Sequence, residues 1–249
     1  MEYESRSYRG HFSTDGRRWF CAKYKETDLW IGVDIGSYSP SMKDEVLGII
    51  IRLRTLMDAY LLIDPGYKES LVPYKPQSAA PLIFHEMAKV CHRTDIGPMS
   101  AVAGALAKYV AVELKKVYPY KEIIVENGGD IYAEAYFDMD IAVFAGQSPL
   151  SEKVGLHIPS SVFPLGICTS SGTVGPSFSM GKADAAMIVC KDVLLADSYA
   201  TAVANRVKTI DDVPSVIDFV STRSDILGAI IIKDDKMAVC GDFELRLFK

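Results

Sequence analysis

The order of the predicted segments constrains the fold of this chain most. Alternating apolar and polar residues over 6–35, interrupted by Ser-Thr-Asp-Gly at 13–16, predict a hairpin followed by a strand at 29–35. Three helices are then predicted in succession, over 41–63, from 81 to about 93, and from Pro98 onward. Strands paired in hairpins and helices that follow helices predict an α+β fold with mixed, largely antiparallel sheets.

The helical region contains two predicted boundary features. Ser41 and Asp44 match the spacing of a capping box at the start of the first helix. The segment 64–77 contains three prolines and is predicted to be a loop.

The second half of the chain is predicted to be mostly strands. The clearest hairpin joins 122–126 to 131–136 through Asn127-Gly-Gly-Asp130. Further predicted strands cover 140–145, 154–158, 165–168 and 183–190. A helix over about 196–207, a shorter helix opened by Pro214, and a closing hairpin of 227–232 and 237–247 complete the prediction. With 249 residues, 49% of them hydrophobic, the chain is predicted to form one domain over 1–249.

Charge and hydropathy exclude several kinds of partner. The net charge is −5, with no basic stripe for a run of phosphates, so no nucleic-acid partner is expected, whereas a small anionic ligand is allowed. The N-terminus lacks the apolar stretch of a signal peptide, and no run approaches the roughly 20 apolar residues of a membrane span. We therefore expect a cytoplasmic protein without a membrane partner. The sequence leaves a homo-oligomer open.

Five widely spaced cysteines argue against a zinc site and a disulfide framework, because no CxxC pair occurs and the total is odd. Cys21, Cys91, Cys190 and Cys240 are expected to be buried thiols. Cys168 differs, since a Thr-Ser-Ser-Gly turn follows it and backbone N–H groups there would favour a reactive thiolate.

Polar side chains are concentrated in 166–184 and 196–205. Asp197 and Thr201 are four apart in a predicted helix and share one face, and Asn205 lies one turn further along it. These oxygens fit a magnesium ion, which takes few protein ligands. The alternative is structural: Asp197 caps the helix and Thr201 bonds back to a carbonyl.

Three further segments are candidate ligand contacts, each with a structural alternative. The turn from Cys168 to about residue 175 predicts either an anion-binding nest of N–H groups or a serine-rich surface loop. The turn Asn127-Gly-Gly-Asp130 predicts either a tight hairpin or a close backbone approach to a ligand, with Asp130 as polar anchor. The helix start at Pro98 offers free N–H groups to an anion.

Four motifs in this order resemble the ApbE family of FAD-binding proteins, which includes flavin transferases, and in particular its shorter UPF0280 branch. The motifs are Gly97-Pro-Met-Ser-Ala-Val-Ala-Gly104, Glu126-Asn-Gly-Gly-Asp-Ile131, Thr169-Ser-Ser-Gly172 and Ala196-Asp-Ser-Tyr-Ala-Thr201. The resemblance covers roughly residues 80–206.

This resemblance implies an ApbE-like α+β fold, FAD or FMN as cofactor, and magnesium held partly by Asp197 and Thr201. The residues implied in flavin binding lie in the first three motifs or directly after the third: Gly97, Met99, Ser100, Asn127, Gly128, Gly129, Asp130, Thr169, Ser170, Ser171, Gly172 and Thr173. The transferases of the family move FMN from FAD to a hydroxyl of an acceptor protein, so such a partner is implied as well.

One departure limits the predicted activity. The transferases carry a histidine-containing segment ending Asp-Pro-x-Thr-Gly, whereas 174–193 takes its place here and contains no histidine. A full transferase cycle is therefore not predicted. Three hypotheses follow. The protein is a flavin- or nucleotide-binding relative of the transferases, a sulfur-chemistry protein that uses Cys168 as its catalytic thiolate, or a non-catalytic ligand-binding protein. The resemblance allows the second hypothesis, because this branch of the family is associated with sulfide assimilation in anaerobes.

Overall fold

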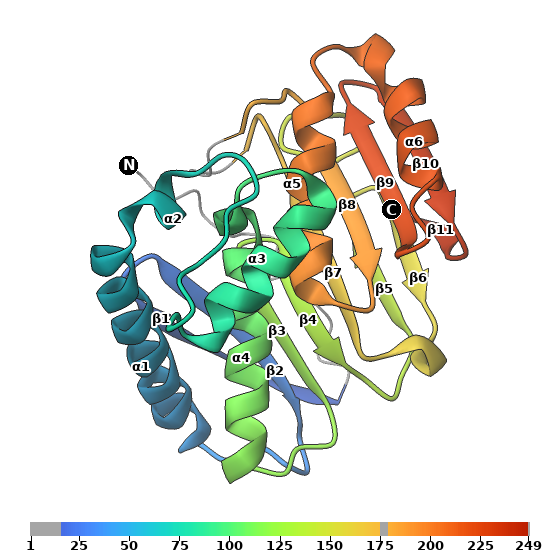
Figure 1. Ribbon diagram of the computed structural model, residues 1–249. Coiled ribbons are helices and arrows are strands. Elements are labelled where there is room, and N and C mark those ends of the chain that lie inside the picture. The colour runs from blue at the N-terminus through green and yellow to red at the C-terminus, as the bar shows by residue number, and fades with distance from the viewer. Residues whose placement is uncertain (1–15, 175–178, 249) are drawn as a thin grey trace.

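The computed structural model of the protein describes residues 16–174 and 179–248, which form three layers: helices, a large sheet and a small sheet (Figure 1). The large sheet has the strand order β1-β2-β3-β4-β7-β8-β9-β10, and every neighbouring pair is antiparallel. Its strands are β1 Arg17–Tyr24, β2 Thr27–Asp34, β3 Ile123–Asn127, β4 Asp130–Glu134, β7 Leu165–Ser170, β8 Ala185–Cys190, β9 Ile226–Lys233 and β10 Lys236–Gly241.

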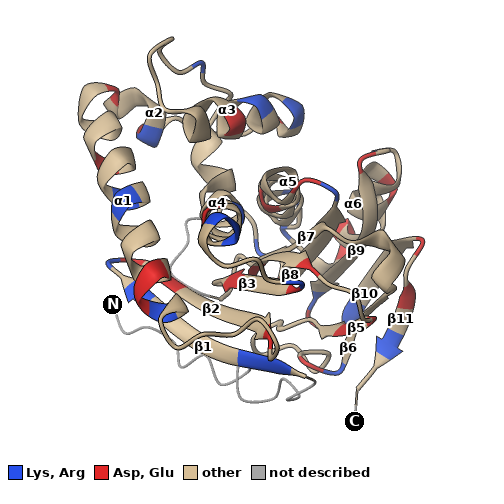
Figure 2. Ribbon diagram, turned by 90° about the horizontal axis from the view of Figure 1, so that it is seen from below, with Lys and Arg blue, Asp and Glu red and all other residues tan. Residues whose placement is uncertain are grey.

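The small sheet has the order β11-β6-β5 and is also antiparallel. Its strands are β5 Met139–Ala142, β6 Val154–Ile158 and β11 Glu244–Leu247. It lies on the face of the large sheet that the helices leave open (Figure 2). The predicted closing strand over 237–247 is thus divided, because the chain leaves β10 after Gly241 and crosses to the small sheet.

The α-helices lie over the other face of the large sheet (Figures 1 and 2). They are α1 Met42–Ile63, α2 Pro65–Glu69, α3 Leu82–Thr94, α4 Val102–Val117, α5 Val193–Arg206 and α6 Val213–Ser221. The short 3-10 helices are η2 Pro98–Ala101, η3 Ser160–Val162 and η4 Ile210–Asp212. The α+β prediction is confirmed by this arrangement.

Strand β8 shows how one large sheet fills two cores. All six of its residues are buried, since helices cover one face and the small sheet covers the other. Ile188 belongs to the apolar cluster beneath α5, whereas its neighbour Val189 belongs to the cluster between the sheets. Successive side chains of a strand point to opposite faces, so a continuous apolar run is the expected pattern here.

Several predicted boundaries are wrong. Ser41 makes no side-chain cap hydrogen bond, so the predicted capping box is absent from α1. The segment predicted as a loop over 64–77 begins with α2, because Pro65 suits the first turn of a helix. The first described hairpin turns at Lys25 and Glu26, while residues 13–15 of the predicted turn lie outside the described residues.

Figure 2 shows Lys and Arg interspersed with Asp and Glu over the helices and strands. Within the part of the chain that the structure describes, none of the helices is long and apolar enough for a transmembrane segment.

Candidate functional site

Helix α5 carries the central carboxylate of the site into the interior. The helix packs against β7 and β8, and Asp197, on its second turn, is only 6% exposed. Asp192 is the residue that caps α5, with its side chain accepting a hydrogen bond from the Leu194 N–H at 3.1 Å. The interpretation of Asp197 as a helix cap is therefore wrong, because α5 begins earlier than predicted.

Asp197 instead joins α5 to α4. Its Oδ2 accepts a hydrogen bond from the Gly104 N–H at 2.8 Å. Only glycine fits at that position, since a Cβ on Gly104 would lie 2.8 Å from the Val193 carbonyl oxygen. Two helices that approach this closely let a first-turn N–H group of α4 point at the carboxylate.

A second carboxylate, that of half-buried Asp130, lies close enough to Asp197 for the two charges to interact. Asp130 begins β4 directly opposite Cys168 of β7, the strand on which α5 packs. Loss of water contact raises the pKa of Asp130 well above its ordinary range, and the negative charge of Asp197 raises it further. Burial also raises the pKa of Asp197, although hydrogen bonds from Gly104 and Ala103 partly offset this effect.

No lysine or arginine among the described residues forms an ion pair with either carboxylate. A buried carboxylate beside a second, half-buried carboxylate is costly without a positive partner, and a bound cation would reduce that cost. The described residues contain no cluster of three His, Cys, Asp or Glu side chains suited to a metal. A cation here would therefore draw on few protein ligands and on oxygens of a bound nucleotide, as magnesium does.

Thr201 and Asn205, which were predicted to share a magnesium-binding helix face with Asp197, differ from each other in their contacts. Thr201 is half-buried, and its hydroxyl makes no hydrogen bond to another described residue, so the predicted back-bond to a carbonyl is absent. Asn205 accepts hydrogen bonds from Ser179 at 3.2 Å and from the Met180 N–H at 2.8 Å. Asn205 therefore fastens the 179–180 segment to α5 and does not act together with Asp197.

The Asn127-Gly-Gly-Asp130 turn closes the site beside the start of α4. Asn127 donates from Nδ2 to the Ala103 carbonyl at 3.1 Å, which attaches the turn to α4. Gly128 and Gly129 have φ values of 71° and 104°, which only glycine adopts readily. The Gly129 N–H binds the Glu126 carboxylate at 2.9 Å, and the Gly129 carbonyl accepts from the Thr169 N–H at 3.1 Å.

The predicted anion nest after Cys168 is wrong for this conformation, because most of its N–H groups are already bonded. Ser171 Oγ accepts from the N–H groups of Thr173 and Val174, both at 3.0 Å, and the Gly172 N–H binds the Ala183 carbonyl. The Thr173 hydroxyl donates to Asp184 at 2.9 Å. What remains for a ligand are the hydroxyls of Thr169 and Ser170, neither of which has a hydrogen bond to another described residue.

Residues 97–101 lie between α3 and α5. Gly97 packs against the Ser70 backbone, since a Cβ there would lie 1.9 Å from the Ser70 carbonyl oxygen. Met99 and Ser100 are half-buried, and the Ser100 hydroxyl lies 2.9 Å from that of Ser198 on α5. The structure thus brings the 97–104, 127–130, 168–170 and 197 segments together at one end of α4.

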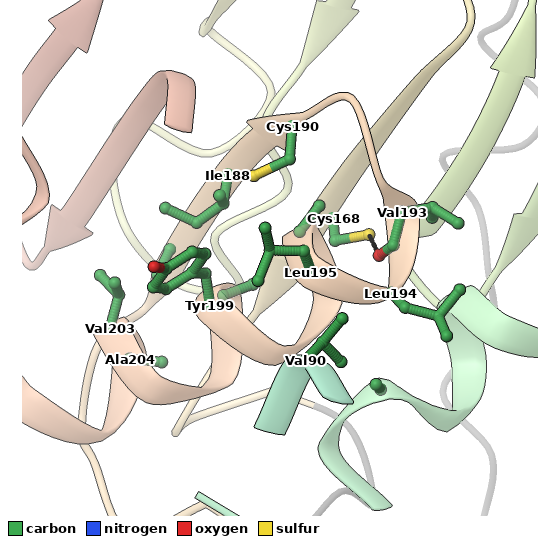
Figure 3. Packing of buried hydrophobic residues seen from close by; sticks show 14 of the residues in the cluster. Val90, Cys168, Ile188, Cys190, Val193, Leu194, Leu195, Tyr199, Val203 and Ala204 are labelled. Carbon is green, nitrogen blue, oxygen red and sulfur yellow. Dashed lines mark hydrogen bonds between the residues drawn. The ribbon is translucent and has the colours of Figure 1, made fainter. Parts of the chain in front are cut away.

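Cys168 does not have the environment predicted for a thiolate. It is fully buried, and its Sγ–H donates to the Val193 carbonyl at 3.6 Å, among the apolar side chains of α5 (Figure 3). Burial raises the pKa of Cys168 well above its usual value, and the nearby Asp130 and Asp197 raise it further. Two of the cysteines expected to be buried are not, because Cys21 is exposed and Cys240 is half-buried.

Sequence reasoning missed specific hydrogen bonds that three residues make in this site, although the small side chains around Gly104 did predict a close approach to its helix. Glu126 and Gly104 both lie inside the motifs described above, but the motifs did not indicate their hydrogen bonds. Glu126 at the end of β3 accepts from the Gly129 N–H in the following turn, and the Gly104 N–H of α4 donates to Asp197 of α5. Ser198 is fully buried next to Asp197 and binds hydroxyls of two other segments. A serine at a position of α5 that faces the core was the available signal, because buried hydroxyls require partners.

Solved structures show which fold this chain shares. The chain is similar to the flavinyl transferase ApbE of Pseudomonas stutzeri, with a TM-score of 0.50 and 12% identity over 92% of this chain and 96% of that one. It is also similar to the ApbE protein of Thermotoga maritima, with a TM-score of 0.53 and 11% identity over 89% and 96%. At these identities the comparison establishes an ApbE-like fold.

Sequence relatives give the family itself. A UPF0280 protein of Methanocella arvoryzae is 38% identical over 195 residues, 78% of this chain and 79% of the relative. Another, from Methanosarcina acetivorans, is 37% identical over 219 residues, 87% and 84% of the two chains. The family model described as AbpE bacteria matches residues 11–228. The chain belongs to this ApbE-like family and is similar to its UPF0280 proteins.

Proposed function

We propose that this protein binds a flavin nucleotide, FAD or FMN, together with a magnesium ion at the junction of α4, α5 and the 127–130 turn. The observation that carries the proposal is a pair of interacting carboxylates, buried Asp197 and half-buried Asp130, that have no positively charged partner among the described residues. The ApbE-like fold supports the choice of ligand.

Asp197 and Thr201 are the proposed protein ligands of the ion. Asp197 supplies a carboxylate that already faces the start of α4, and Thr201 supplies a hydroxyl without a hydrogen-bond partner in the described chain. Such hard oxygen ligands, few in number, suit magnesium. When bound, the ion would neutralise negative charge on the phosphates of the nucleotide.

The hydroxyls of Thr169 and Ser170 and the backbone of the Gly128-Gly129 turn are the proposed flavin contacts. Both lie next to Asp130, because β4 and β7 pair in the register that places Asp130 opposite Cys168. Four residues of the predicted site have a structural role in this proposal: Gly97, Ser171, Gly172 and Thr173. Their backbone or side chains pack against or hydrogen-bond to other parts of the protein, and they hold the contact residues in place.

We propose that the protein binds the nucleotide but does not transfer FMN. In the transferases that the sequence resembles, a histidine-containing segment precedes the metal aspartate, and 174–193 has no histidine. We therefore expect FAD incubated with the protein and magnesium to remain intact. Chromatography that detects AMP released faster than in a protein-free control would show that transfer or hydrolysis survives.

Ligand-induced stabilisation tests the proposal directly. A ligand that binds only the native state adds RT ln(1 + [L]/Kd), roughly 2.7 kcal/mol at a hundredfold excess over Kd. Melting temperatures should therefore rise with FAD and magnesium, and mass spectrometry of ligand released from the purified protein should find a flavin. If FAD, FMN, ATP and ADP all leave the midpoint unchanged at millimolar concentration with magnesium, the proposal fails.

A further inference from the structure

The two sheets end together at one edge of the molecule. β10 is the last strand of the large sheet and β11 is the last strand of the small sheet, and only residues 242–243 separate them in the chain (Figures 1 and 2). Among the residues that the structure describes, neither strand has a further strand on its outer side. Their outward backbone N–H and C=O groups are therefore open to a partner.

Side chains that face the core are left uncovered at this edge. Leu245 of β11 lies opposite buried Leu156 of β6. Leu247, two positions further on, lies opposite buried Val154. Directly opposite side chains share one face of a sheet, so both leucines point to the core between the sheets, yet they are 37% and 76% exposed. Val239 of β10, opposite a residue of the same core, is 37% exposed as well. Apolar side chains that gather at an exposed edge mark a surface for a partner.

The backbone hydrogen bonds determine which groups of β11 point outward. The Phe248 N–H donates to the Lys153 carbonyl at 2.8 Å, on the β6 side. Backbone groups along an antiparallel strand point alternately to its two sides, so the even-numbered residues of β11 also bond to β6. The N–H and C=O groups of Leu245 and Leu247 consequently point to the free side.

We propose that β11 pairs in antiparallel orientation with β11 of a second copy of this chain, across a two-fold axis at Leu245. A pairing of a strand with its own copy repeats the same contacts on both sides and closes the assembly as a dimer. At this register each Leu245 N–H donates to the Leu245 carbonyl of the other copy. The small sheet then continues across both copies.

Charge selects this register among the symmetric ones. Glu244 and Arg246 lie on the other face of β11, away from the core. An axis at Leu245 places Glu244 opposite Arg246 of the second copy, and the symmetry makes this pair twice. An axis at Arg246 would instead place two arginines opposite each other, and an axis at Leu247 would leave Glu244 outside the paired strands.

The same register covers the open core. Leu245 of one copy lies beside Leu245 of the other, and Leu247 lies beside Phe243, which already packs against the core between the sheets. Water is thereby removed from apolar side chains that one chain alone leaves exposed, and this burial favours association.

Sedimentation equilibrium of the full chain tests the pairing through its charges. The wild type should sediment at twice the mass of one chain at micromolar concentration. Glu244→Arg and Arg246→Glu each place like charges opposite one another twice, so each should raise the dimer dissociation constant about ten- to a hundredfold. An equimolar mixture of the two variants should dimerise like the wild type, because every cross-strand charge pair is then Arg opposite Glu. Restored dimerisation also shows that both variants fold. The double variant Glu244→Arg/Arg246→Glu should dimerise for the same reason.

Disulfide trapping tests the position of the axis. The background is Cys21→Ser/Cys240→Ala, because these two cysteines are the ones that are not buried. Leu245→Cys should form an oxidised dimer, since residues that exchange both hydrogen bonds lie about 5.5 Å apart between Cα atoms, within disulfide range. Leu247→Cys is the matched control on the same face. It is more exposed, but its two copies lie four positions apart along the strands, about 13 Å, and should not form a disulfide.

Three results would overturn the inference. They are a wild type that stays monomeric over the whole concentration range, a dimer that persists unchanged in both single charge variants, and oxidation of Leu247→Cys to a dimer ahead of Leu245→Cys. These measurements use no flavin or magnesium, so their outcome is separate from that of the proposed function.

Discussion

Replacement of Asp197 by Asn separates a metal ligand from a structural carboxylate. The amide keeps the size of the side chain and an oxygen that accepts from the Gly104 N–H, but it removes the buried charge. We expect Asp197→Asn to be more stable than the wild type without ligand at alkaline pH. We also expect it to lose the magnesium-dependent part of nucleotide binding.

The magnitude follows from the raised pKa. Burial raises the pKa of Asp197 from 3.8 to about 7. At about 1.4 kcal/mol per pH unit, ionisation of this carboxyl costs the folded state at most about 4 kcal/mol. The native state binds the extra proton between these two pKa values, so the free energy of unfolding of the wild type falls as pH rises from about 4 to 7. The stability that the neutral form provides is fully present below pH 4 and is lost above pH 7.

Urea denaturation of both proteins from pH 4 to pH 8 measures this difference. The advantage of Asp197→Asn should be near zero at pH 4 and should reach its maximum, up to about 4 kcal/mol, at pH 8. Titration of FAD with and without magnesium then tests the metal assignment. Asp192→Asn is the matched control, since Asp192 is an exposed carboxylate on the same helix that acts as its cap. A variant that gains nothing at pH 8, or that keeps the magnesium effect, would refute the reasoning.

Three further predictions concern single residues of the site. Thr201→Val keeps the shape of the side chain and should weaken the magnesium dependence of FAD binding about tenfold with little change in unliganded stability; an unchanged magnesium titration would remove Thr201 from the ligand set. Gly104→Ala should lower the free energy of unfolding by about 1–3 kcal/mol, because its Cβ would lie 2.8 Å from the Val193 carbonyl oxygen, and a denaturation midpoint equal to that of the wild type would argue against the close helix contact. Limited alkylation with peptide mapping should label exposed Cys21 before buried Cys168, whereas early labelling of Cys168 would show that the interior of α5 opens readily.

The prediction for Cys168 reverses what the sequence indicated. A hydroxyl-rich turn after a cysteine suggested N–H donors around a thiolate, yet those N–H groups bind Ser171 and Ala183. The thiol itself lies beneath α5 (Figure 3). Which way a strand end points, and what covers it, depends on elements far away in the chain, so local composition could not determine the pKa.

Periodicity and turn chemistry determined much of the fold by themselves. Alternation and the Asn-Gly turn predicted the β3–β4 hairpin, and the paired strands and consecutive helices predicted the α+β class. The resemblance of four short motifs also led to the correct family. These features depend on residues close together in the chain, where the physical signal is local.

Only the tertiary structure decided how the site is assembled. Asp197 meets Gly104 across 93 positions of sequence, and Ser198 meets Thr94 across 104. The interaction of Asp130 and Asp197 depends on the β4–β7 register and on α5 packing against β7. Burial, which raises the pKa values of both carboxylates, and the charge of Asp197, which raises the pKa of Asp130 further, are properties of that packing and not of any segment alone.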